Sequence, residues 1–104
     1  MGNEITFQEV NAKLISLVQA LLGSISPNFR AVILEYLDEV WWLTFILEQD
    51  NPEDQEEIVE ITTVFEGFQE GSIDYEVVIE ITDKDLHLPM DTLTRRCAYR
   101  RRER

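Results

Sequence analysis

The chain has 104 residues, the length of a single domain, and its net charge of −12 comes from 21 acidic and nine basic residues. Apolar residues make up 44% and charged residues 29%, a balance typical of a globular domain and not of a disordered segment. The negative charge opposes binding to nucleic acids and anionic membranes, and no apolar run approaches the roughly 20 residues that span a bilayer. We therefore expect one domain over residues 1–104 whose partner is neither a nucleic acid nor a membrane.

The first expected element is a helix that begins after Thr6. Thr6 and Glu9 have the spacing of a capping box, and Gly23 is typical of the residue that follows a helix. Apolar residues recur at helical spacing between these two ends. Because Ile15 and Leu22 are apolar but lie off the main stripe, the pattern predicts a helix that is buried on more than one side.

The next region, residues 30–48, contains two β-like runs that only Asp38 and Glu39 separate. This spacing predicts a tight hairpin. Side chains alternate along a strand, so Trp41 shares one face with the apolar residues and Trp42 lies on the other, mixed face. Two outcomes stay open. Either helices cover only one face and Trp42 is available to a partner, or both faces are covered.

An acidic helix and two strands complete the chain. Asn51 as the cap and Pro52 as the first helical residue predict a helix start, and Gly71 predicts its end. Residues 73–82 alternate cleanly between apolar and polar and predict a strand, and residues 93–101 predict the last strand. The order is helix, strand, strand, helix, strand, strand. We expect an α+β fold, a mainly antiparallel sheet of about four strands with two helices packed on it.

The charges are unevenly distributed along the chain. Residues 48–85 contain fourteen acids and one base, whereas residues 86–104 contain six arginines and two acids. We expect the arginines to pair with the acidic strand 73–82, because opposite charges on adjacent strands are stabilising. The remaining acids are then free to face a basic partner.

Eight side chains are candidates for contact with that partner. Acids of the second helix and acids of the third strand form two competing patches, and the sequence leaves open which of them makes the contact. An outward-facing tryptophan would add an aromatic anchor. The candidates are Trp42, Glu53, Glu56, Glu57 and Glu60, together with Asp74, Glu76 and Glu80.

Catalysis, a cofactor and a metal site are not expected. His87 is the only histidine and Cys97 the only cysteine, and their flanks match no nucleophile pattern. The acids that open the second helix lie at the positive end of its dipole, where they are stabilising while solvated, and no calcium-loop glycine accompanies them. A lone cysteine also fits a reducing compartment, the cytoplasm.

Three segments, residues 24–32, 51–58 and 98–103, resemble small bacterial immunity proteins of polymorphic and contact-dependent growth-inhibition toxin systems. The resemblance implies a cytosolic antidote that binds a cognate toxin domain and blocks its active site. Such toxins are often basic nucleases, with a ribonuclease favoured over a deoxyribonuclease. The alternative is a non-inhibitory adaptor or self-associating scaffold, and a small enzyme with carboxylate chemistry ranks third. The sequence leaves the oligomeric state open.

Overall fold

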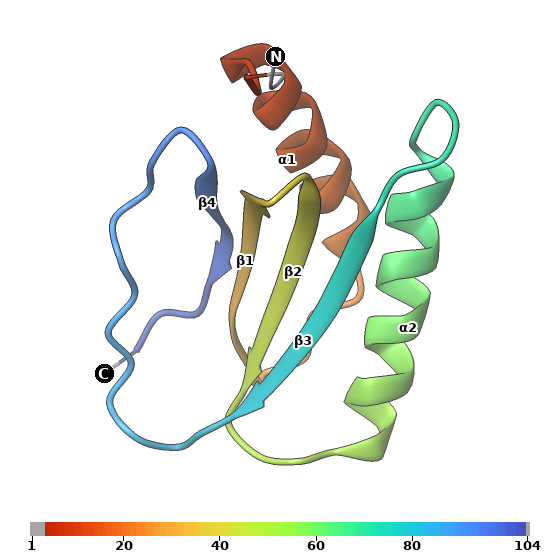
Figure 1. Ribbon diagram of the computed structural model, residues 1–104. Coiled ribbons are helices and arrows are strands. Elements are labelled where there is room, and N and C mark those ends of the chain that lie inside the picture. Colours follow the sequence, from red (N-terminus) through yellow and green to blue (C-terminus); the bar gives the residue numbers. More distant parts are fainter. Residues whose placement is uncertain (1–3, 104) are drawn as a thin grey trace.

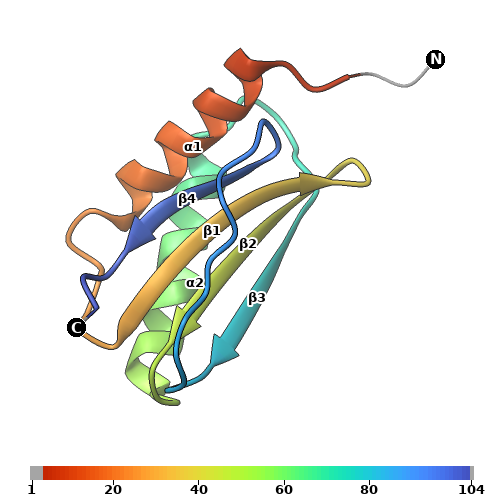
Figure 2. The same cartoon turned by 90° about the vertical axis from the view of Figure 1, so that its left-hand side faces the viewer.

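A computed structural model describes residues 4–103, which form one four-stranded sheet with two helices on one of its faces (Figure 1). A view turned by 90° shows that residues 82–94 cross the other face of the sheet (Figure 2). The elements are α1 (Phe7–Leu21), β1 (Phe29–Leu37), β2 (Val40–Leu47), α2 (Pro52–Gly67), β3 (Tyr75–Ile81) and β4 (Arg95–Arg100).

The strand order across the sheet is β3-β2-β1-β4. β1 is antiparallel to both β2 and β4, whereas β2 and β3 are parallel. The prediction of an α+β fold with two helices and four strands is confirmed, but the sheet is mixed and not mainly antiparallel. The reason is that α2 joins β2 to β3, and a helical crossover returns the chain to start the next strand in the same direction.

The last strand, β4, lies beside β1 at the far edge from β3. The expected pairing of the C-terminal arginines with the acidic strand is therefore wrong. Instead, Arg95 of β4 pairs with Glu35 of β1 at 3.8 Å, and Arg101, just beyond β4, pairs with Glu48 at 2.8 Å. The strand order thus leaves β3 without cationic neighbours in the sheet.

The start and end of α1 follow from its sequence. The Thr6 hydroxyl accepts from the Glu9 N–H at 3.1 Å, the Glu9 carboxylate accepts from the Thr6 N–H at 3.2 Å, and Gly23 takes a φ of 80° just past the helix. Burial on more than one side is wrong, however. Ile15 is 57% exposed and Leu22 is 74% exposed, because only one face of α1 packs on the rest of the molecule.

The hairpin and the start of α2 are also encoded locally. Asp38 and Glu39 have φ values of 54° and 64°, as a two-residue type I′ connection requires, which confirms the predicted hairpin. The Asn51 side chain accepts from two backbone N–H groups of the first turn of α2, at 2.9 and 3.2 Å. The expected end at Gly71 is wrong, since α2 ends at Gly67.

The hydrophobic core lies between the helices and the sheet. Phe29, Phe45 and Phe65 are fully buried there, and Trp41 is 6% exposed. Residues 82–94 cross the opposite face of the sheet (Figure 2), and Ile46, which strand alternation assigns to that face, is buried. The crossing segment therefore shields part of the sheet that the helices leave open.

A buried arginine holds this crossing segment in place. Arg30 is only 4% exposed, and its guanidinium donates to the carbonyl oxygens of Thr82 at 2.8 Å and Lys84 at 2.7 Å. It also forms an ion pair with Glu103 in the C-terminal segment. Arg30 thereby ties β1, the start of the crossing segment and the end of the chain together.

Candidate partner-binding surface

Trp42 lies on the sheet face that the helices do not cover. It is half-buried, and its register partners are Glu76 on β3 and Glu35 on β1. The indole Nε1 donates to the carbonyl oxygen of Leu37 at 3.3 Å. Trp41 points to the core, so the two tryptophans occupy opposite faces as alternation predicts.

Three acids accompany Trp42 on this face, and we call them the open-face acids: Asp74, Glu76 and Glu80. All three are exposed. Glu76 lies beside Trp42, and Glu80 lies beside Ile46 in the parallel pairing of β3 with β2. Asp74 immediately precedes β3, where its carbonyl oxygen accepts from the Trp41 N–H at 2.9 Å. The structure thus groups these three acids with Trp42.

The other four predicted acids lie on α2, and we call them the helix acids: Glu53, Glu56, Glu57 and Glu60. Glu57 is half-buried and the other three are exposed. The opposite side of α2 carries the buried residues that pack on the sheet. The helix acids therefore point away from the sheet, and the structure does not bring them together with the open-face acids.

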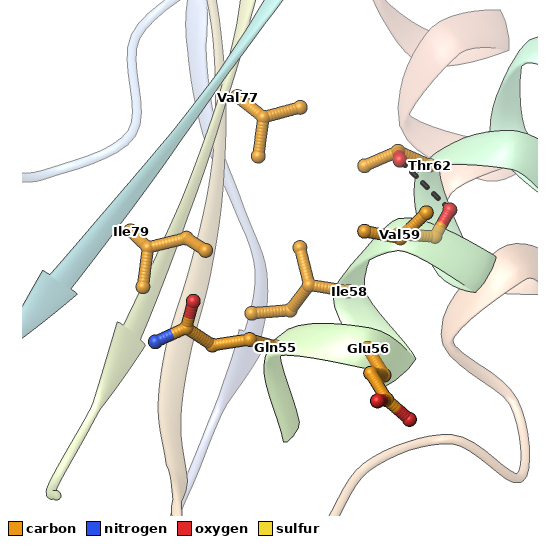
Figure 3. Close-up of a pocket in the computed structure, with 7 residues that line it drawn as sticks. All are labelled: Gln55, Glu56, Ile58, Val59, Thr62, Val77 and Ile79. Carbon is orange, nitrogen blue, oxygen red and sulfur yellow. Dashed lines mark hydrogen bonds between the residues drawn. The ribbon is translucent and has the colours of Figure 1, made fainter. Parts of the chain in front are cut away.

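A groove separates the two acidic groups along the β3 edge of the molecule (Figure 3). Its volume is about 330 Å³, and Val77 and Ile79 of β3 point across it toward Ile58 and Val59 of α2. Val59 is 62% exposed and Val77 is 39% exposed. Sequence reasoning missed this groove, because alternation places Val77 and Ile79 on the core side without showing that their strand is at an edge.

Among the described residues, no arginine forms an ion pair with either acidic group. Within residues 4–103 the ion pairs join Arg30, Arg95 and Arg101 to Glu35, Glu48 and Glu103, and no helix acid or open-face acid takes part. Glu66 near the end of α2 accepts a hydrogen bond from the Tyr75 hydroxyl at 2.8 Å, and this bond is the main cause that raises the pKa of Tyr75. Both acidic groups consequently add to the negative field outside the molecule.

Cys97, the lone cysteine of the chain, is a free and half-buried thiol on β4. Burial, and then the charge of Asp91, raises the pKa of the Cys97 thiol, which donates to the carbonyl oxygen of Tyr99 at 3.2 Å. A raised pKa disfavours the nucleophilic thiolate. Residues 4–103 contain no cluster of three or more histidine, cysteine or acidic side chains able to hold a metal ion. No helix in the same range is long and apolar enough to cross a membrane.

Comparison with known proteins assigns the chain to a family. The family model described as MafI2 immunity protein matches residues 11–103. The matched range includes most of α1 and all of the other helix and the four strands. No curated protein matches the chain. Since the family model covers nearly the whole chain, the chain belongs to the MafI2 immunity protein family.

Proposed function

We propose that this chain neutralises a basic toxin domain, a nuclease and in first place a ribonuclease, by binding it one to one and covering its active site. The observation that supports this proposal is that the helix acids and the open-face acids have no cationic partner within residues 4–103. Nucleases are basic around the active site because their substrate is a polyanion. The surface of an acidic antidote would be electrostatically complementary to that basic surface. In this proposal the chain acts by binding in the cytoplasm and catalyses no reaction.

The charge supports a two-stage association. The net charge of −12 attracts a basic domain over distances comparable to the Debye length, which raises the association rate. Short-range contacts then set the lifetime of the complex. Trp42 is suited to this role, because partly exposed aromatic side chains ringed by charge are frequent anchors at interfaces.

Protection in living cells tests the immunity role and identifies the toxin. Toxin domains encoded near this chain's gene would be expressed one at a time, with and without the chain. The domain whose toxicity the chain relieves is the cognate toxin, and we expect it to be basic and to degrade RNA in vitro. If the chain relieves an acidic toxin, or one that does not act on nucleic acid, the proposed class of partner is wrong.

Charge reversal tests which acids the toxin contacts. Glu76→Lys with Glu80→Lys changes the open-face acids, and Glu56→Lys with Glu60→Lys changes the helix acids by the same total charge. A matched control, Glu4→Lys with Glu70→Lys, reverses two exposed acids outside both groups. Circular dichroism would check that each of the three double variants still folds.

We expect both test variants to bind the toxin more slowly than the control, since each moves positive charge next to a basic surface. The association rate of the wild-type chain should also fall steeply as ionic strength rises from about 0.01 M to about 1 M, because the Debye length shrinks from about 30 Å to about 3 Å. An association rate that does not change with salt would remove electrostatic steering from the mechanism.

One observation favours the alternative of a self-associating scaffold. Ile15, Val18 and Leu22 form an exposed apolar stripe on α1, next to a groove of about 380 Å³ that Tyr99 helps to line. Like charge opposes pairing of two such chains, each with a net charge of −12. Sedimentation velocity distinguishes the two functions: a monomer that becomes a heterodimer with the toxin supports the antidote, and a stable homo-oligomer that ignores the toxin supports the scaffold.

A further inference from the structure

One edge of the sheet is formed by β3, and its outward backbone groups have no partner within residues 4–103. The Trp41 N–H donates to the Asp74 carbonyl oxygen at 2.9 Å, and the Thr82 N–H donates to the Leu47 carbonyl oxygen at 3.0 Å. The pairing with β2 runs between these bonds without a bulge. Because backbone groups alternate sides along a strand, even-numbered residues of β3 face β2 and odd-numbered residues face outward. The outward residues are Tyr75, Val77, Ile79 and Ile81.

The other edge of the sheet, β4, is closed by the chain itself. The Thr92 N–H donates to the outward carbonyl oxygen of Arg95 at 2.8 Å, and the outward N–H of Cys97 donates to the Asp91 carboxylate at 3.0 Å. Proteins commonly protect edge strands in this way, because a free edge is a template for another strand. Within residues 4–103 no comparable segment bonds to the outer edge of β3. Within the described residues, the chain therefore covers the β4 edge of the sheet and leaves the β3 edge open.

The two sides of the β3 edge differ in chemistry. The side toward α2 is the apolar groove, where Val59 and Val77 are exposed beside Ile79 (Figure 3). The opposite side carries Glu76 and Glu80, which point to the open face of the sheet. A strand that paired with β3 would place alternate side chains in these two environments. Its side chains toward α2 would need to be apolar. The side chains between them would lie beside Glu76 and Glu80, so basic side chains are favoured at those positions.

We propose that a strand of the toxin domain, with alternating apolar and basic side chains, adds to the β3 edge and extends the sheet of this chain. The proposal rests on the proposed function, since the toxin supplies the strand. Backbone hydrogen bonds to the outward groups of β3 provide affinity, and the alternation provides specificity. The basic side chains would lie beside Glu76 and Glu80, which are exposed on the open face of the sheet.

Proline at Val77 tests this geometry. The Val77 N–H points outward, so Val77→Pro removes no bond to β2, and edge strands tolerate proline at such a position. Val77→Ala is the matched control, because it shortens the same side chain and keeps the N–H. We expect Val77→Pro to weaken toxin affinity at least about tenfold more than Val77→Ala, since the lost hydrogen bond alone accounts for about two- to tenfold and the ring also obstructs an approaching strand. Calorimetric titration with an inactive form of the cognate toxin domain measures the affinity of each variant.

Amide hydrogen exchange resolved by residue provides a test without any substitution. In the free protein we expect rapid exchange at Val77, Ile79 and Ile81, and slow exchange at Glu76 and Val78, whose N–H groups face β2. The toxin should slow the odd-numbered amides and leave the even-numbered ones unchanged. If the odd-numbered amides exchange as fast in the complex as in the free protein, or if Val77→Pro binds as tightly as Val77→Ala, strand addition is wrong while the antidote role stands. If the wild-type chain binds no toxin, the proposed function itself fails.

Discussion

Replacing Arg30 with methionine tests whether this one side chain holds the crossing segment and the end of the chain. Arg30→Met keeps an apolar stem of similar length at a site that is 4% exposed. It removes the hydrogen bonds to the carbonyl oxygens of Thr82 and Lys84 and the ion pair with Glu103. The substitution therefore releases contacts to two distant segments without opening a large cavity.

The expected loss follows from these contacts. Each hydrogen bond from a charged donor contributes about 1.5–3 kcal/mol. Lys84 is exposed, so water can replace the donor at its carbonyl oxygen, whereas Thr82 is half-buried and is harder to hydrate. The burial of the methionine side chain offsets part of the loss. We expect the free energy of unfolding to fall by about 3 kcal/mol, equivalent to a decrease in Tm of roughly 12–24 °C for a domain of this size.

Urea unfolding followed by the fluorescence of Trp41 and Trp42 measures this loss. Arg101→Met is the matched control, because Arg101 also pairs with Glu103 but its side chain is 26% exposed. Ion pairs near the surface contribute less, so we expect the control to lose about 1 kcal/mol or less. Equal losses in the two variants, or a loss below about 1 kcal/mol in Arg30→Met, would refute the argument that burial makes these bonds strong.

Three further predictions concern single residues. Hydrogen bonds from Arg30 and then Arg101 lower the pKa of Glu103 from 4.5 to about 2, so its stabilisation is complete above about pH 4.5 and is lost as the pH falls toward 2. The Tm difference between wild type and Glu103→Gln should shrink as the pH falls from about 4.5 toward 2. A difference that stays constant over this pH range would contradict the stabilising role of the Glu103 carboxylate. Glu39→Gly should raise stability by about 0.5–1 kcal/mol while Glu39→Ala does not, because relief of the positive φ exceeds the entropy that glycine adds to the unfolded chain. His87→Ala and Cys97→Ala should leave protection against the toxin intact, and loss of protection in a folded variant would indicate catalysis.

Features that depend on neighbours a few residues apart could be predicted from the sequence alone. The capping box of α1 and the Asn51 cap of α2 involve residues two or three positions apart, and the hairpin at Asp38 and Glu39 involves adjacent ones. Opposite orientations of Trp41 and Trp42 follow from strand alternation alone. These signals act through local backbone hydrogen bonds, so they hold whatever the rest of the chain does.

The strand neighbours and the open edge of the sheet, by contrast, follow from how the whole chain packs. Sequence reasoning placed the C-terminal arginines beside the acidic strand, but β4 pairs with β1, and Arg30 reaches residues more than fifty positions away. It also could not show that the helix acids and open-face acids lie on opposite sides of a groove at the β3 edge. Opposite charges are compatible with many pairings, and their attraction at a surface is weak. The burial of Phe29, Phe45 and Phe65 between the helices and the sheet has a larger effect on stability, so packing of the whole core selects the strand order and places the charges.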